Sequence, residues 1–393
     1  MEYEIVVGLE VHCQLSTQTK LFCSCANSFT LEPNAHTCPG CLAMPGAMPV
    51  LNHRALEYAI RASLALNCNV ADFCRFERKH YFYPDLPAGF QTSQLQHAVG
   101  HNGSLLLSTP DGRKKIGINR VQLEEDAGKL LHKGGGSSGI DLNRVGSPLI
   151  EIVSEPDMRS AAEARAYLEL LRQTLMYCGV SDCNMEEGSL RCDANVSVHP
   201  KGTDKFGVRN EIKNLNSFRA VESAVQAMAA ELVRRTEDGE PIRQTTWGYN
   251  LDKARLYEMR SKETAKDYRY SNAPDLPLVP VAPAWVEEIR SSLPELPSDR
   301  KLRIIEEQGL SEYDASLVTL DKPTADYYEE VAKFVDSPKD AANWMINEVA
   351  RELNSRSLDI ADFPLGARAL ADLVLMVREK KIDRKSTRLN SSH

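Results

Sequence analysis

The sequence predicts an α+β protein, in which helices cover one face of an antiparallel sheet and a helical region follows. Three observations support this class. Several segments alternate apolar and polar residues, which is typical of strands with one buried face. Other segments repeat apolar residues at helical spacing behind a capping residue. Strands and helices do not alternate regularly along the chain, which argues against a parallel sheet.

Composition indicates a globular protein of two or three domains. The chain has 393 residues, of which 42% are hydrophobic and 26% charged, and its formal net charge is -8. Because no long basic tract offsets this charge, unspecific nucleic-acid binding is not expected, and we expect no DNA partner. No run of about 18 apolar residues occurs, so we expect no membrane contact. Ten cysteines, four of them clustered, fit a reducing cytoplasm.

The first predicted strand covers residues 4–15, EIVVGLEVHCQL. Its apolar residues alternate with Glu10, His12 and Gln14, so the polar face carries a Glu-x-His pair. Residues two apart on one face are separated by roughly 7 Å, which lets both side chains reach one ion or phosphate. A surface ion pair on a solvated face is the alternative interpretation.

Four cysteines come next, in the pattern Cys23-x-Cys25 and Cys38-x-x-Cys41. Four thiolates at this spacing suit tetrahedral zinc, and the site offers no open coordination position, so the ion would be structural. Free thiols or disulfides are the alternatives. The segment between the outer cysteines contains no lysine or arginine, which argues against a nucleic-acid-binding zinc ribbon.

A helix is expected over residues 52–66, with Asn52 as its cap. Residues 76–94 then combine an aromatic strand with a loop that contains prolines and a glycine. Four polar residues of this stretch line a pocket in one interpretation and belong to an ordinary loop in the other. They are Lys79, His80, Asp85 and Gln91.

A second group of acids follows the strand expected at residues 113–123, which ends in Glu124-Glu125-Asp126. Adjacent carboxylates repel one another unless a cation or water neutralises them. Residues 134–139 are predicted to form a plain glycine-rich loop. In the next strand, residues 148–154, Glu151 lies between isoleucines, either on the polar face of a sheet or as a buried ligand.

The third part of the sheet is expected after a helix at residues 160–178, which Ser160 caps. A strand at 190–198 alternates apolar residues with Arg191 and Asp193, and a strand at 206–215 carries further polar residues. Asn216 is the expected cap of the helix that follows. The proline-containing segment PELP at 294–297 marks a linker, and residues 298–381 are helical in pattern.

The polar face of such a sheet would collect many acids, one imidazole and no cysteine. This donor set suits a hard cation, Mg²⁺ or Mn²⁺, that holds ATP phosphates and lets two anions meet. The pattern therefore predicts ATP-dependent phosphoryl transfer to an anionic acceptor such as a carboxylate. The expected cation ligands and catalytic residues are Glu10, His12, Glu125, Glu151, Asp193 and Glu211, and the candidate γ-phosphate clamps are Lys129, Arg191 and Lys213.

Six motifs resemble signatures of the GatB/GatE family, the B-type subunits of bacterial tRNA-dependent amidotransferases: GLEVH, HYFYPDLP, EEDAGK, DLNRVGSPLIEIVSEPD, MEEGSLRCDANVSV and EIKNLNSF. The resemblance implies a glutamine-synthetase-like catalytic cradle over residues 1–293, with a zinc knuckle at 23–41. An all-helical tRNA-binding domain over 294–383 would follow. Residues 384–393 resemble nothing in the family, so a non-native or disordered tail is expected there and the C-terminal tail domain is expected to be missing.

The resemblance also implies the reaction. ATP would phosphorylate the side-chain carboxylate of Glu-tRNA(Gln) or Asp-tRNA(Asn), and ammonia from an amidase subunit would displace the phosphate to give the amide. A third, small subunit would hold the other two together in a heterotrimer. The six expected cation ligands would fall on metal and nucleotide positions of the family. Nucleotide binding would also involve Lys129, Glu187, Arg191, Lys213 and Asn214.

Two rival functions belong to other classes. A zinc-ribbon nucleic-acid adaptor would use the acids only as solvated faces, would bind no ATP and would need a basic ribbon. A free-standing ligase resembling glutamine synthetase would need no helical C-terminal domain.

Overall fold

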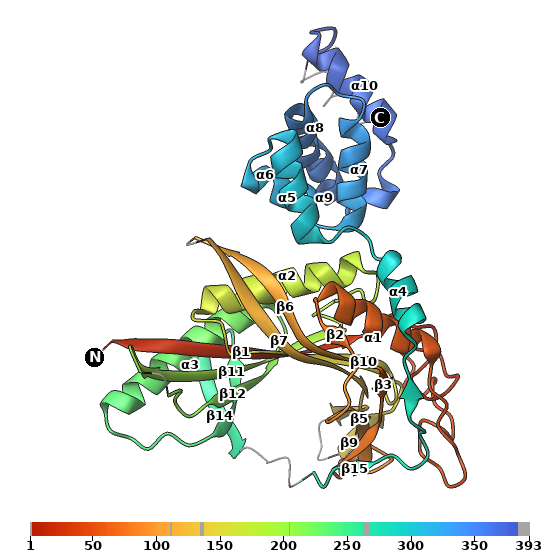
Figure 1. The fold of residues 1–393 in the computed structure, drawn as a ribbon, viewed down its shortest axis with the longest axis vertical. Coiled ribbons are helices and arrows are strands. Elements are labelled where there is room, and N and C mark those ends of the chain that lie inside the picture. Colours follow the sequence, from red (N-terminus) through yellow and green to blue (C-terminus); the bar gives the residue numbers. More distant parts are fainter. Residues whose placement is uncertain (1, 111, 134–136, 204, 262–267, 384–393) are drawn as a thin grey trace. The chain divides into compact units, whose positions relative to one another are not determined.

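The computed structural model describes residues 2–110, 112–133, 137–203, 205–261 and 268–383. The chain divides into two compact units, Met1–Leu293 and Pro294–His393. Figure 1 shows that the first unit contains the sheet and that the second is built from helices. Residues 384–393, expected from the sequence to form a tail, lie outside the described residues.

A large sheet organises the first unit, and it is mainly antiparallel, as predicted, but not entirely. One pair, β12 with β13, is parallel, and the other pairs described for this sheet are antiparallel. Its strands are β1 (Tyr3–Gln14), β2 (Asn69–Val70), β6 (Gly100–Thr109), β7 (Gly112–Glu125), β10 (Pro148–Ser154), β11 (Leu190–Pro200), β12 (Asn210–Leu215), β13 (Thr245–Asn250) and β14 (Arg255–Ser261). Their order is β14-β13-β12-β11-β1-β10-β7-β6-β2, so β1 is the central strand.

The alternation predicted for residues 4–15 is the alternation of β1. Val7, Leu9, Val11 and Cys13 are at most 1% exposed, whereas Glu10 and the other even-numbered polar residues stay partly exposed. The buried face packs against the helices α1 (His53–Ala65), α2 (Ala161–Tyr177) and α3 (Phe218–Glu237), which Figure 1 shows along the sheet. One face of the sheet is therefore core, and the other is left for polar side chains.

Helix caps follow the sequence with one exception. Asn52 accepts hydrogen bonds from the backbone N–H groups of Arg54 and Ala55, and Ser160 accepts one from Glu163. At α3 the cap is Ser217, which accepts from the N–H of Ala220, rather than the expected Asn216. Two adjacent residues of good capping chemistry gave no basis for choosing between them.

Smaller sheets lie beside the large one. They are formed by β15 (Ser271–Asn272), β4 (Glu77–His80) and β5 (Phe90–Ser93), in that order, by β16 (Val279–Pro280) with β3 (Phe73–Cys74), and by β8 (Lys129–Lys133) with β9 (Ser137–Asp141). Residues 137–139, expected in a loop, thus begin a strand, while 134–136 lie outside the described residues. The helix α4 (Pro283–Ser291) closes this unit.

The described elements of the second unit are all helical. They are α5 (Pro297–Gln308), α6 (Glu312–Val318), α7 (Lys322–Ala332), α8 (Pro338–Trp344), the π-helical turn η1 (Met345–Val349), α9 (Ala350–Arg356), the 3-10 turn η2 (Ile360–Asp362) and α10 (Ala367–Arg378). Tyr328, Trp344 and Leu370 belong to their shared core. Among the described residues, no helix combines the length and apolarity needed to cross a membrane.

Candidate active site

The polar face of β1 meets two neighbouring strands at His12. In the antiparallel register His12 lies opposite Glu151 of β10 on one side and opposite Arg191 of β11 on the other. The imidazole Nε2 lies 3.6 Å from a carboxylate oxygen of Glu151. Glu124 of β7 completes the group, since one ligand atom from each of the three side chains lies within 4.8 Å of the others. We call His12, Glu124 and Glu151 the central group.

The central group contains Glu124 where the sequence analysis placed Glu125. Side chains alternate along β7, so Glu124 shares a face with Gln122, which lies opposite Glu151 in the register. The Gln122 amide donates to Glu151 at 3.0 Å and to Glu124 at 2.6 Å. Glu125 points elsewhere and accepts from the backbone N–H of Thr92 at 2.9 Å. The apolar residues that precede the acids could have shown this, because period two assigns Glu124 to the polar face.

The charges of the central group are coupled by burial. Burial alone would lower the pKa of His12, but Glu151 outweighs it and raises that pKa to about 9. Burial opposes ionisation of Glu151, yet the His12 imidazolium lowers its pKa to about 2. Burial, together with the charge of Glu151, raises the pKa of Glu124 to about 7. Protons here supply positive charge that a divalent cation could supply instead.

Glu10 lies next to this group on β1 and faces a cavity. It accepts a hydrogen bond from the Asn195 amide at 2.8 Å and is opposite Asp193 in the register. The cavity encloses about 310 Å³, a volume in the range of small-molecule sites. It is lined by Val6, Gly8, Leu9, Glu10, Val153, Ser154, Pro156, Asn195, Ser197, Phe206, Gly207 and Arg209. We call it the strand cavity.

One wall of the strand cavity depends on Gly207. A Cβ atom at this position would lie 2.1 Å from the carbonyl oxygen of Val198, a separation that no side chain tolerates. The missing side chain lets the segment before β12 approach β11 and brings Phe206 and Arg209 to the rim of the cavity.

The remaining predicted acids, Asp193 and Glu211, are held by a lysine. Lys213 Nζ lies 2.9 Å from Asp193 and 3.4 Å from Glu211. Burial disfavours the charged amine, but these two carboxylates outweigh it and raise the pKa of Lys213. Asp193 also accepts from the backbone N–H of Asn214 at 3.1 Å, and Glu211 from the hydroxyl of Thr246 at 3.0 Å. Lys213 thus offsets one of the two negative charges, and neutral donors hold both acids beside the central group.

The residues predicted to bind phosphate or nucleotide do not all lie near the central group. Arg191 donates to Asp126 at 2.8 Å, and Arg144 lies 3.1 Å from the same carboxylate. Lys129 is exposed on β8, and Glu187 is exposed in the turn before β11. Among the described residues, no hydrogen bond or ion pair joins either of the last two side chains to the central group.

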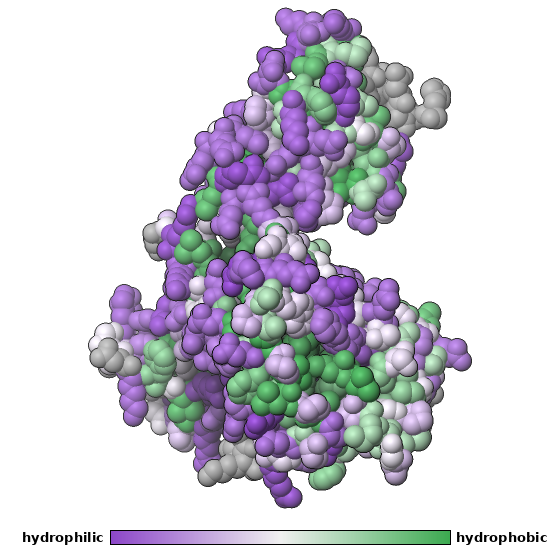
Figure 2. All heavy atoms as spheres, turned by 45° about the vertical axis from the view of Figure 1, so that its right-hand side comes forward, coloured by the Kyte–Doolittle hydropathy of each residue, from purple (hydrophilic) through white to green (hydrophobic). Residues whose placement is uncertain are grey.

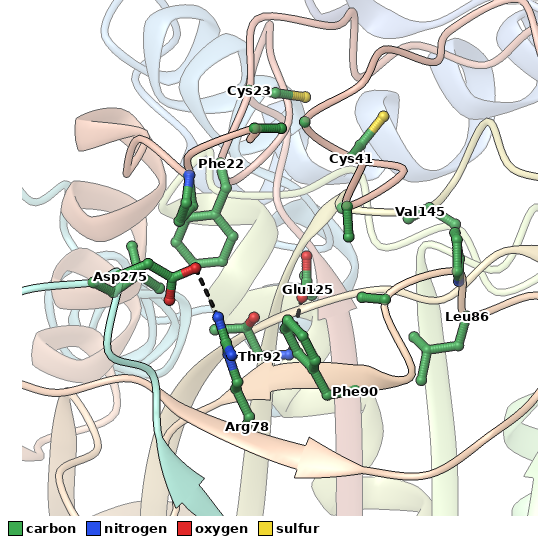
Figure 3. Close-up of a pocket in the computed structure, with 18 of the residues that line it drawn as sticks. Phe22, Cys23, Cys41, Arg78, Leu86, Phe90, Thr92, Glu125, Val145 and Asp275 are labelled. Carbon is green, nitrogen blue, oxygen red and sulfur yellow. Dashed lines mark hydrogen bonds and ion pairs between the residues drawn. The ribbon is translucent and has the colours of Figure 1, made fainter. Parts of the chain in front are cut away.

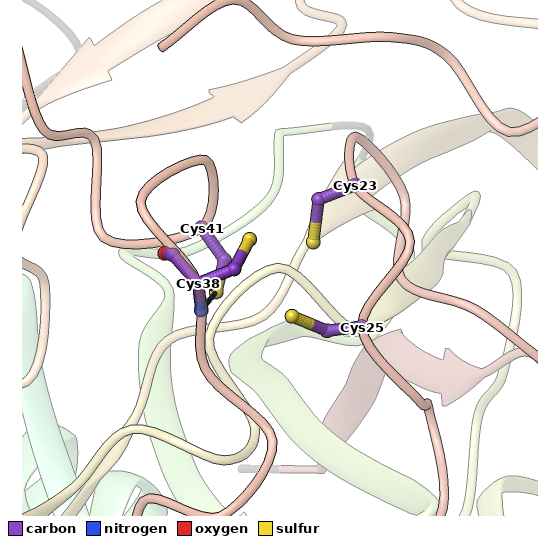
Figure 4. A group of neighbouring side chains, drawn as sticks. All are labelled: Cys23, Cys25, Cys38 and Cys41. Atoms are coloured by element: carbon purple, nitrogen blue, oxygen red, sulfur yellow. Dashed lines mark hydrogen bonds between the residues drawn. The ribbon is translucent and has the colours of Figure 1, made fainter.

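The four predicted knuckle cysteines come together. One sulfur from each of Cys23, Cys25, Cys38 and Cys41 lies within 4.8 Å of the others, and Figure 4 shows the four side chains converging. The backbone N–H of Cys38 donates to the Cys41 sulfur at 3.2 Å. The donor set and its closure fit a structural zinc ion.

A buried lysine contacts the same cysteine knuckle. Lys20 is fully buried, and its Nζ donates to the His36 carbonyl at 2.6 Å and lies 3.7 Å from the Cys41 sulfur. A hydrogen bond from Cys23, the backbone of Cys38 and the charge of Lys20 lower the pKa of the Cys41 thiol, although burial opposes them. Thiolate, the form that binds metal, is favoured at this position.

A second cavity separates the knuckle from β5. Figure 3 shows Glu125, Arg78 and Phe90 around it, together with Cys23 and Cys41. Arg78 is paired with Asp275 at 2.7 Å, and burial raises the pKa of Glu125. Of the four polar residues expected to line a pocket in 76–94, Gln91 reaches the central group and donates to Glu124 at 3.2 Å.

Comparison with known proteins gives consistent results over nearly the whole chain. The family model described as the GatB/GatE catalytic domain matches residues 5–287, and the model described as the GatB domain matches residues 326–389. The B-type subunit of the aspartyl/glutamyl-tRNA(Asn/Gln) amidotransferase of Carboxydothermus hydrogenoformans is 51% identical over 368 residues, which cover 93% of this chain and 76% of that protein. The protein of the same name from Moorella thermoacetica is 47% identical over 388 residues, covering 98% and 82%.

Proposed function

This chain belongs to the GatB/GatE family, and we propose that it is the synthetic subunit of a tRNA-dependent amidotransferase. ATP would phosphorylate the side-chain carboxylate of Glu-tRNA(Gln), Asp-tRNA(Asn) or both, and ammonia would replace the phosphate to form the amide. The chain would then act as an ATP-dependent carbon–nitrogen ligase in protein synthesis, and we expect it in the cytoplasm. The central group next to the strand cavity is the observation that carries this proposal.

The central group fits a divalent cation, which would be held by His12, Glu124 and Glu151. Such an ion, Mg²⁺ or Mn²⁺, would neutralise the phosphates of ATP and the attacked carboxylate. Gln122 fixes the two glutamates by donating to both, and Arg120 fixes Gln122 by donating to its carbonyl at 2.7 Å. The side chains that would bind the cation are therefore oriented before the ion or a substrate binds.

The strand cavity suits the nucleotide. Apolar residues line part of it, while Glu10 and Ser154 face it from the strands and Arg209 from its rim. Arginine pairs well with phosphate oxygens, and Glu10 lies two residues from His12 on the same face of β1. ATP bound there would have its phosphates directed along β1 toward the central group. Lys213 would hold Asp193 and Glu211 beside them and offset part of their negative charge.

The first unit would be the catalytic cradle, with the glutamine-synthetase-like fold of the family, and the second would bind tRNA. Ammonia would come from a glutaminase of the amidase type, and a small third subunit would hold it to this chain. Apolar side chains gather on one face in Figure 2, and five residues at or near the knuckle are exposed: Phe29, Leu31, Met44, Met48 and Val50. An exposed apolar surface of this kind suits a partner protein. Zinc in the knuckle would be structural.

The decisive test uses the full chain with ATP, Mg²⁺, ammonium chloride and glutamyl-tRNA. Wild-type protein should produce ADP and glutaminyl-tRNA together. Glu124→Gln should reduce turnover by about 100-fold or more, because it removes one charged ligand of the cation. Glu237→Gln, at an exposed acid at the end of α3, is the matched control and should act as wild type. Near-normal turnover of the Glu124 variant at saturating Mg²⁺ would contradict the assignment.

A further inference from the structure

Three tyrosines and a lysine gather beside the central group. Lys79 belongs to β4 and Tyr81 follows this strand directly, whereas Tyr268 and Tyr270 precede β15. The backbone N–H of His80 donates to the carbonyl of Tyr268 at 2.9 Å, which fastens the later segment to β4. We call Lys79, Tyr81, Tyr268 and Tyr270 the tyrosine cluster.

The tyrosine rings meet edge to face. The centroids of Tyr81 and Tyr268 are 6.2 Å apart at an interplanar angle of 73°, and those of Tyr268 and Tyr270 are 6.3 Å apart at 80°. In an edge-to-face pair the edge of one ring meets the face of the other, so the ring that presents its edge keeps its faces clear of that neighbour and can stack with a flat group. All three side chains are partly exposed.

Lys79 differs from the other cations near the site. Its Nζ lies 4.8 Å from the centroid of the Tyr268 ring and 5.9 Å from that of Tyr81. Arg191 and Lys213 are paired with acids, but within the described ranges no carboxylate lies within ion-pair distance of Lys79. An ammonium group held by aromatic rings and unpaired with an acid can accept an anionic ligand.

The tyrosine cluster and the strand cavity lie on different sides of the central group. The cavity takes Val153 and Ser154 from β10, whereas Glu124 lies opposite Leu149 at the other side of Glu151. Lys79 is opposite Gln91 in the β4–β5 pair, and Gln91 contacts Glu124. Phosphorylation of a carboxylate needs two anionic substrates that reach one cation, so two entries fit this chemistry.

We infer that the tyrosine cluster receives the aminoacylated 3′ end of the tRNA, with its unpaired bases stacked on the tyrosines and a backbone phosphate paired with Lys79. This inference rests on the proposed function. Single-stranded RNA is typically held by aromatic rings together with cations, and stacking tolerates any base. A terminal nucleotide placed here would direct its aminoacyl side chain toward Glu124 and the cation.

The test measures binding and kinetics separately with the full chain. The binding probe is the trinucleotide CCA carrying glutamate through a stable amide at its 3′ end. Tyr268→Leu should weaken probe binding and raise KM for glutamyl-tRNA about tenfold, with KM for ATP unchanged. Tyr268→Phe keeps the ring and should restore most of the affinity. Tyr257→Leu, which removes an exposed tyrosine of β14, is the control, and melting curves check that every variant is folded.

Lys79→Met supplies an independent measurement. It should weaken the probe and make its dissociation constant less dependent on salt, since one phosphate contact is lost. Binding of the Tyr268→Leu variant equal to wild type would overturn the inference, as would absence of probe binding by the wild type. A raised KM for ATP alone would assign the cluster to the nucleotide and overturn it too. If the wild type binds the probe, the leucine variant does not, and no amidation occurs, the proposed function fails and the cluster remains a nucleotide-stacking site.

Discussion

Replacing Gln122 by methionine should destabilise the first unit and make its stability depend on Mg²⁺. Gln122 is only 4% exposed, and its amide is the donor shared by Glu124 and Glu151. Methionine conserves volume and removes both hydrogen bonds, so the two buried carboxylates lose the group that separates their charges.

The size of the effect follows from those two contacts. A hydrogen bond to a charged group contributes about 1.5–3 kcal/mol. Glu151 keeps its ion pair with His12, and Glu124 keeps its hydrogen bond from the Ser93 hydroxyl, so the loss falls at the low end for each. We expect a decrease of about 3 kcal/mol in the free energy of unfolding. For a unit of this size, Met1–Leu293, the melting temperature would fall by about 5 °C.

The assay is thermal unfolding of the full chain in EDTA and in Mg²⁺. Because Gln122 would orient the proposed cation ligands, its loss should also weaken Mg²⁺ affinity by about 10–100-fold, so the variant should need more Mg²⁺ to recover stability. Gln226→Met, at an exposed glutamine of α3, should melt as wild type. If Gln122→Met unfolds at the wild-type temperature and shows the same Mg²⁺ dependence, Gln122 neither stabilises Glu124 and Glu151 nor orients them for a cation.

Two further predictions concern the knuckle and the second unit. Purified without chelator, the chain should contain about one zinc ion, and Cys38→Ser should release it and lower the melting temperature; metal analysis that finds no zinc would contradict this. In the second unit burial opposes ionisation of Asp326, but Lys322 and Arg300 prevail and lower its pKa, so its contribution to stability is complete above the unfolded pKa near 4 and is lost as pH falls through the folded one. Hydrogen exchange in α5 and α7 should therefore accelerate below about pH 4, and Arg300→Met should reduce this pH dependence; equal dependence in both proteins would refute the assignment.

Periodicity made the central strand predictable, and its partners less so. The alternation in residues 4–15 assigns Glu10 and His12 to one face, which the structure places beside Glu151. It gives no information on the strand that supplies the third acid: period two assigns Glu124 to the polar face of its own strand, but it does not show that this face meets His12 and Glu151. Glu125 is fixed by the N–H of Thr92, a backbone donor of β5 that comes beside β7 only in the folded chain. Such a contact leaves no mark in local sequence.

The tyrosine cluster shows the same limit. Tyr81 could be recognised as part of an aromatic strand, but Tyr268 and Tyr270 come from the far end of the first unit. They reach β4 because Ser271 and Asn272 pair with Arg78 and Glu77. Those two residues have low strand propensity, so the pairing depends on tertiary structure rather than on local preference. The cysteine pattern was easier, because ligand spacing alone specifies a closed site.

The central position of β1 has a consequence for the order of synthesis and folding. This strand is synthesised well before its neighbours β10 and β11, which begin at Pro148 and Leu190. Until those segments are made, an apolar strand has both edges unpaired, and closing such long loops is slow. Both edges of β1 are therefore exposed during much of translation. The central group is completed late, because Glu151 belongs to β10, so a nascent chain interrupted before Pro148 would lack part of this group and would have an increased tendency to aggregate.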